Sequence, residues 1–156
     1  MVISRSSWER LVELWDISEV VSIISKALAS LHMIEIGLYE RGVDVDTLIR
    51  NIRSCESILR KLLVDLELYI SGKAPESELV TLLMEAYGET DVEKLKHHLK
   101  KAIQGLEKLT EMATYRPLDK DMLRDEDIAE LENLLTLLSS TLSKKAEQMA
   151  SELYAI

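Results

Sequence analysis

Phenylalanine is absent from this chain of 156 residues, and cysteine, proline and glycine are rare. The single cysteine, Cys55, excludes an internal disulfide and a zinc site built on cysteines. Two prolines and five glycines leave long stretches in which nothing interrupts a helix. The apolar residues are mainly leucine, isoleucine, valine and methionine, and we therefore expect long helices with few joints.

Basic charge is also scarce, since 19 lysines and arginines stand against 28 acidic residues and the net charge is −9. Such a balance disfavours nucleic acid and anionic membranes as partners, and we expect neither. The N-terminus lacks the basic-then-apolar pattern of a signal peptide. Glu19, Lys26, His32 and Glu35 interrupt the longest apolar run, so we expect no membrane span and a cytoplasmic protein. The low count of Asn, Gln and Cys is typical of thermophilic proteins.

The segment 17–39 organises the fold. On a helical wheel its apolar residues occupy an arc of about 160°, far wider than a helix can leave in water. They are Ile17, Val20, Val21, Ile23, Ile24, Ala27, Leu28, Leu31, Ile34, Leu38 and Tyr39. This pattern predicts a central helix that ends at Gly42 and is covered by others.

Three later segments carry apolar seams spaced alternately three and four residues apart, as in helical bundles. The seams are Leu48, Ile52, Cys55, Leu59, Leu62, Leu66, Tyr69; Val92, Leu95, Leu99, Ala102, Leu106, Leu109, Ala113; and Ile128, Leu131, Leu135, Leu138, Leu142, Ala146, Met149, Leu153. The whole chain is thus predicted to be one all-α domain, an antiparallel bundle of four long helices. The connection 72–90 is long and contains its own short helix. We expect it to cross the bundle and give an up-down-down-up order, with simple up-down order as the alternative.

The N-terminal turns do not continue the pattern of the central helix. Trp8, Leu11, Val12 and Trp15 fall on the face opposite its apolar arc. Asp16 and Glu19 form a capping-box pattern, which favours a helix break at 16–17 and a separate short N-terminal helix. The alternative is one continuous helix whose first turns pack on another subunit.

Small residues line two of the predicted helices, at Ser18, Ser22, Ser25, Ala29 and at Ser139, Ser143, Ala146, Ala150. Such ridges let helix axes approach closely. The simpler interpretation is that these two helices are neighbours. The other is that one ridge is a contact between copies of the chain in a homo-oligomer.

Glu35 is the best candidate for chemistry because it is the only charged residue inside the apolar arc of 17–39. A carboxylate there needs a partner or a raised pKa. His32 lies one turn earlier, and the pair could bind a ligand or exchange a proton. The alternative is that Glu35 reaches solvent near the end of its helix.

Other groupings favour plain structural roles. His97 and His98 are adjacent and point in different directions on a helix, so they do not form a usual metal pair. A di-iron bundle needs Glu-x-x-His motifs, and none is present, so we expect no metal and no cofactor. Arg50, Arg53, Arg60 and Lys61 lie on the outer face of their helix beside Val64 and Leu68, a face that could dock an acidic partner but is more simply solvated.

The long helices with a crossing connector resemble the cobalamin adenosyltransferase-like bundles of small archaeal proteins. That resemblance implies a fold and a trimeric assembly. The enzymes of that family carry a Thr-Arg-x-Gly-Asp-x-Gly nucleotide loop, whereas residues 3–7 here read Ile-Ser-Arg-Ser-Ser. The resemblance therefore implies neither that activity nor any site residue.

These patterns predict a non-enzymatic soluble helical bundle that acts through self-assembly or partner binding. Trp8, Leu11, Val12 and Trp15 are the candidate interface. The alternative is a binder of nucleotides or cobalamins, or an enzyme, with an interhelical pocket around Glu35 and His32.

Overall fold

The computed structural model describes residues 5–37, 45–73, 84, 92–115 and 120–154. In chain order its elements are α1 (Arg5–Glu35), α2 (Val45–Ile70), α4 (Val92–Tyr115), the short 3-10 helix η2 (Lys120–Arg124) and α5 (Glu126–Tyr154). The described residues are helical apart from the turns that follow α1, α2 and η2. The all-α class is therefore confirmed.

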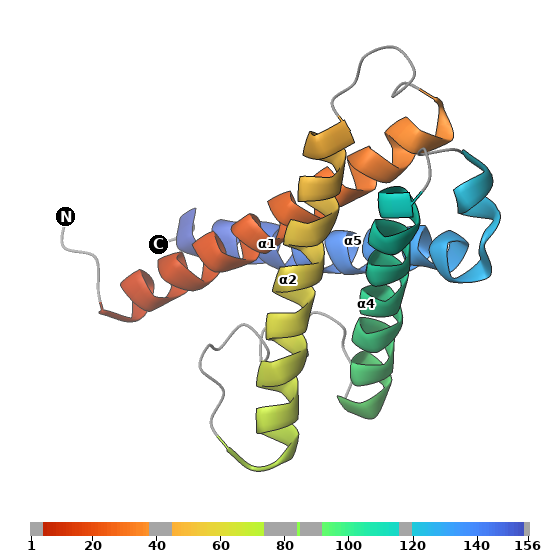
Figure 1. The fold of residues 1–156 in the computed structure, drawn as a ribbon. Helices are drawn as coiled ribbons and strands as arrows, with labels where there is room; N and C mark the ends of the chain where they lie inside the picture. The colour runs from red at the N-terminus through yellow and green to blue at the C-terminus, as the bar shows by residue number, and fades with distance from the viewer. Residues whose placement is uncertain (1–4, 38–44, 74–83, 85–91, 116–119, 155–156) are drawn as a thin grey trace.

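The four long helices form a ring of contacts, in which α1 packs on α5 and α2, and α4 packs on α2 and α5. Figure 1 shows α1 and α5 side by side, with the α2–α4 pair lying across them. Contacts within each pair are more extensive than contacts between the pairs. This is what crossed helices give, because they touch over a shorter length than aligned ones.

The direction of α4 relative to α2 differs from the predicted one. In Figure 1 α2 runs downwards and α4 begins at the same lower end and runs back up. The predicted crossover is therefore wrong. The length of the connection 72–90 allows it to span the bundle, but it equally allows α4 to begin at the end where α2 finishes. The short helix predicted within 75–87 lies outside the described residues, apart from Met84.

The predicted break at 16–17 is also wrong, because α1 continues without interruption through Asp16. Asp16 and Glu19 are both exposed on a regular helix, and the Ser18 hydroxyl donates to the carbonyl oxygen of Leu14 at 2.8 Å. The change of apolar face therefore reflects two different surfaces on one helix, the alternative that the sequence left open.

Glycines end the first two helices by adopting positive φ, which costs other residues more. The helix α1 ends at Glu35, with Gly37 at φ 69°, earlier than the predicted end at Gly42. After α2, Gly72 has φ 77°, and the Gly72 and Lys73 amides donate to the carbonyls of Tyr69 and Leu68. These two bonds form a Schellman motif.

The predicted seams of α2, α4 and α5 make up most of the core. Their fully buried members are Leu48, Ile52, Cys55, Leu59, Leu62, Leu66, Leu95, Leu99, Ala102, Leu106, Leu109, Ile128, Leu131, Leu135, Leu138, Leu142 and Met149. Tyr69 was predicted to end the α2 seam, but it lies 43% exposed in the last turn of the helix. Ile103 and Gly105 are buried as well, although neither belongs to a predicted seam.

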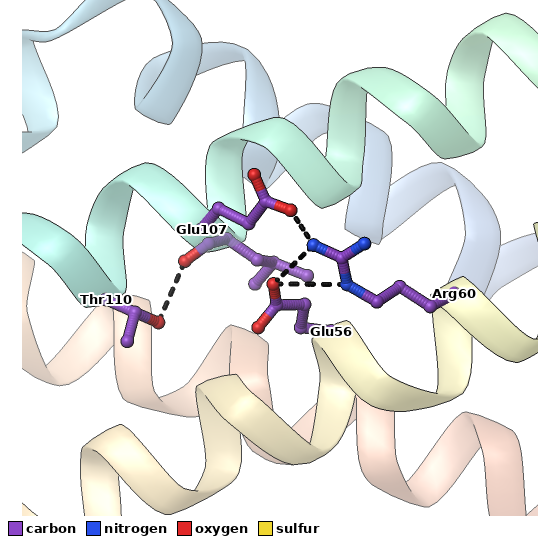
Figure 2. Close-up of polar contacts among 5 residues, drawn as sticks. Glu56, Arg60, Glu107 and Thr110 are labelled. Atoms are coloured by element: carbon purple, nitrogen blue, oxygen red, sulfur yellow. Dashed lines mark hydrogen bonds and ion pairs between the residues drawn. The ribbon is translucent and has the colours of Figure 1, made fainter.

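An ion-pair group ties α2 to α4 at the surface. Figure 2 shows the Arg60 guanidinium between Glu56 of its own helix and Glu107 of α4. Its Nε and Nη2 donate to Glu56 Oε1 at 3.3 and 3.1 Å. The Thr110 hydroxyl, also drawn there, donates to the carbonyl oxygen of Leu106, which belongs to the same helix, α4.

Candidate functional site

Glu35 and His32 lie in the last turn of α1, where their side chains are 54% and 65% exposed. His32 Nδ1 stands 3.7 Å from Glu35 Oε2. Glu35 falls inside the apolar arc of the helical wheel, yet it reaches solvent because α1 ends at this residue. The carboxylate is therefore not buried, and Glu35 reaches solvent near the end of its helix, which is the alternative that the sequence left open.

A cleft of about 410 Å³ lies beside Glu35, where the end of α1 meets η2 and the start of α5. It is lined by Leu31, Glu35, Leu123, Arg124, Ile128, Ala129 and Glu132. The cleft is open to solvent, and His32 is not among its lining residues. Glu35 and His32 therefore do not converge on one enclosed pocket. Among the described residues no group of three His, Cys, Asp or Glu side chains is placed to hold a metal ion.

The remaining polar candidates are dispersed. His97 is exposed and His98 half-buried, with their ring centroids 6.5 Å apart on adjacent positions of α4. Cys55 is buried in the core, and this burial raises the pKa of its thiol to about 12. A thiol with so high a pKa is a poor nucleophile or metal ligand at neutral pH.

The basic face of α2 is partly neutralised. Arg60 is held by Glu56 and Glu107, whereas Arg50 and Arg53 remain exposed around a shallow depression formed by α2 alone. Further along α2, one turn after Arg60, Val64 is 55% exposed, and Leu68 is half-buried. The depression on this face is thus charged but is formed by a single helix.

The predicted interface residues are on the surface. Leu11, Val12 and Trp15 are 38%, 56% and 73% exposed. Trp8 belongs to α1, but its side chain lies outside what the structure describes. Large apolar side chains grouped on one exposed helix face are a common mark of an interaction surface.

These residues begin a longer pattern, which we call the outer stripe. Its eight members are spaced alternately four and three residues apart, and all are exposed: Leu11, Trp15, Ser18, Ser22, Ser25, Ala29, His32 and Ile36. The stripe contains no Asp, Glu, Lys or Arg. The opposite, buried face of α1 repeats the same spacing at Ile17, Val20, Ile24, Ala27, Leu31 and Ile34. The helix thus has two heptad faces, of which only one is covered.

The small residues of α1 belong to this uncovered face. Although α1 and α5 are neighbours, Ser18, Ser22, Ser25 and Ala29 are exposed and so do not pack on α5. The ridge of α5, at Ser139, Ser143, Ala146 and Ala150, is half-buried. All members of the outer stripe can be read from the sequence. Leu11 and Trp15 align with the members from Ser18 onwards, however, only when α1 is continuous through Asp16.

The same helix passes a simple test for a membrane span. Leu11–Glu35 is long enough, and a window of 18 residues within it has a mean hydropathy of 1.4, with 39% of that window buried in the fold. The expectation that charged residues exclude any such segment is therefore wrong on length and composition alone. Core helices of soluble proteins pass the same test, so it does not decide where the protein resides.

No protein-family model, characterised protein or solved structure matches this chain. The resemblance to cobalamin adenosyltransferase-like bundles therefore stays a prediction.

Proposed function

We propose that this protein is a non-enzymatic, cytoplasmic helical bundle that acts through self-association, and that the outer stripe of α1 is its contact surface. The observation that carries this proposal is an exposed, uncharged heptad stripe in a chain of which 30% is charged. A soluble helix that faces only water normally carries charged residues on that side.

The composition of the outer stripe suits a second helix. Trp15 is the kind of side chain that anchors an interface when it is desolvated, and Leu11 one turn away adds exposed apolar area beside it. The small residues from Ser18 to Ala29 let another helix approach closely over three turns. Burying this surface removes apolar area from water, and no charge on the stripe has to be desolvated.

The experiment is a concentration series by analytical ultracentrifugation on the full chain and on Trp15→Glu. The wild type is expected to associate reversibly, and Trp15→Glu to remain monomeric with an unchanged far-UV circular dichroism spectrum. Tyr115→Glu is the matched control, because Tyr115 is 82% exposed at the end of α4 and is not part of the stripe. A wild type that stays monomeric at every concentration would refute the proposal.

The cleft beside Glu35 supports a second candidate, a binding site for a small molecule. Arg124 offers a positive group and Glu35 and Glu132 negative ones, around the apolar Leu31 and Ile128. A thermal-shift panel of nucleotides and cobalamins would test it. A ligand whose stabilising effect is lost in Glu35→Gln would support this function, whereas an effect that persists in the variant would move the site elsewhere.

A further inference from the structure

We propose that the occupant of the outer stripe is the same stripe of a second copy of this chain, packed antiparallel about a two-fold axis with Glu19 of each copy facing Lys26 of the other. This inference rests on the proposed self-association and adds its orientation and register. Three features of α1 support it.

The first feature is the distribution of size along the stripe. In the proposed register Ser22 lies opposite Ser25 of the second copy, and Ser18 opposite Ala29. Trp15 then lies opposite His32, and Leu11 opposite Ile36. Small side chains thus meet at the centre and large ones at both ends. Two crossing helices need this distribution, because their axes are closest at the crossing point and diverge away from it.

The second feature is the flank of the stripe. Val12, Glu19, Lys26 and Met33 follow one another at seven-residue intervals, along the side next to the stripe. Val12, Glu19 and Lys26 are exposed and Met33 is half-buried. In an antiparallel pair this flank faces itself, so that Glu19 meets Lys26 and Val12 meets Met33, each contact occurring twice. Within the part of the chain that the structure describes, neither Glu19 nor Lys26 forms an ion pair.

The third feature is a groove of about 200 Å³ between α1 and α2, on this same flank. It is lined by Lys26, Ala29, Ser30, Met33, Thr47, Leu48 and Asn51. Within this lining Asn51 Nδ2 donates to the Ser30 hydroxyl at 3.4 Å. The proposed register places Val12 of the second copy beside Met33, at the mouth of this groove.

A parallel pair would not use these features. In a parallel pair the flank would face the other side of the partner's stripe, at Leu14, Val21 and Leu28. A parallel pair would thus set Glu19 and Lys26 against apolar side chains and form no ion pair on this flank. It would also gather both tryptophans at one end of the contact. The charges of the flank therefore favour the antiparallel pair.

The length of the stripe sets the expected strength. From Leu11 to Ile36 it runs about 38 Å at 1.5 Å per residue, and a helix about 10 Å wide offers roughly 400 Å² of footprint. A stable complex buries about 800 Å² on each partner. The dimer is thus expected to be weak and reversible, and the measurement has to extend to several hundred micromolar.

Charge reversal tests the register. We expect Glu19→Lys and Lys26→Glu each to weaken dimerisation about tenfold, because each places two like-charged pairs where two opposite pairs stood. The double variant Glu19→Lys/Lys26→Glu restores the pairs and is expected to dimerise within about twofold of the wild type. An equimolar mixture of the two single variants is expected to form heterodimers more readily than either variant forms homodimers.

The controls separate this inference from the proposed function. All substituted positions are exposed, and circular dichroism of each variant verifies the fold. If Trp15→Glu abolishes association but the charge reversals leave it unchanged, the register is overturned and self-association stands. If the wild type is monomeric throughout, or floats with phosphatidylcholine–phosphatidylglycerol vesicles as a monomer, both proposals are overturned.

Discussion

Gly105 of α4 lies so close to Leu131 of α5 that a Cβ at position 105 would stand 3.1 Å from the Leu131 Cβ. The same added atom would be 3.2 Å from the carbonyl oxygen of Asp127, in the first turn of α5. The absence of a side chain at Gly105 therefore permits the close approach of two crossed helices.

Replacing Gly105 by alanine is expected to lower the free energy of unfolding by about 1 kcal/mol. Alanine gains about 1 kcal/mol of helix propensity over glycine, but the new methyl group overlaps a backbone oxygen that moves only with the start of α5. Urea denaturation measures the outcome. Gln104→Ala, one residue away and exposed, is the control and should change stability by less than about 0.5 kcal/mol. A stabilised Gly105→Ala would contradict the close packing.

A lysine of α4 and the start of α5 form an electrostatic link with a predictable pH dependence. Lys108 Nζ lies 2.7 Å from Asp125 Oδ2 and 3.1 Å from Asp127 Oδ2. Its hydrogen bond to Asp125 lowers the pKa of that carboxyl and raises the pKa of Lys108. Asp125 therefore contributes stability above the unfolded carboxyl pKa of about 3.9, and this contribution is lost as the pH falls through the lower folded value. Lys108 contributes below about pH 10.4 and loses its contribution as the pH rises through its higher folded pKa.

We expect Lys108→Met to make the acid limb of the stability profile shallower. Without the ammonium group the folded pKa of Asp125 moves back towards its unfolded value, so less stability remains to be lost on acidification. Urea midpoints measured from pH 2 to pH 7 would show the wild type and the variant converging at the acid end. Lys100→Met is the matched control, since Lys100 is exposed on the same helix. Parallel profiles would show that Lys108 does not shift this carboxyl.

Cys55 should be inert in the folded protein. Its thiol is buried, and desolvation raises its pKa to about 12, so that little thiolate exists at pH 8. A chromogenic disulfide reagent is expected to react with it only after unfolding in urea. Ser57→Cys introduces an exposed thiol two residues away on α2 and should react at once. Two equally fast thiols in native Ser57→Cys would show that α2 does not bury Cys55.

The sequence predicts α2, α4 and α5 well because each has a single apolar stripe, and one stripe fits only one way of facing a core. The helix α1 has two stripes on opposite faces. The same residues are then compatible with two separate helices that each bury one face, and with one continuous helix that has an apolar stripe on each of two faces. The capping pattern at Asp16 favours the two separate helices, whereas α1 is continuous. Leu11, Val12 and Trp15 were predictable as interface candidates because they are large. The line from Ser18 to Ala29 was not, because small residues give little amphipathic signal. The path between α2 and α4 was undetermined, since chain length limits only how far a connection can reach.

The continuity of α1 can be tested with Asp16→Ala, because the sign of its effect on the free energy of unfolding depends on whether the helix is broken at this residue. In the middle of an exposed helix alanine is the better helix former, so Asp16→Ala should raise the free energy of unfolding by about 0.5 kcal/mol. If Asp16 instead capped a separate helix, the same substitution would remove a cap and lower stability by about 1 kcal/mol. Asp125→Ala is the comparison in which a cap is removed, because Asp125 Oδ1 accepts a hydrogen bond from the Asp127 amide at 3.0 Å at the start of α5. Urea denaturation is therefore expected to show Asp16→Ala stabilised and Asp125→Ala destabilised. A loss in both would place a cap at Asp16 and would separate Leu11 and Trp15 from the rest of the outer stripe.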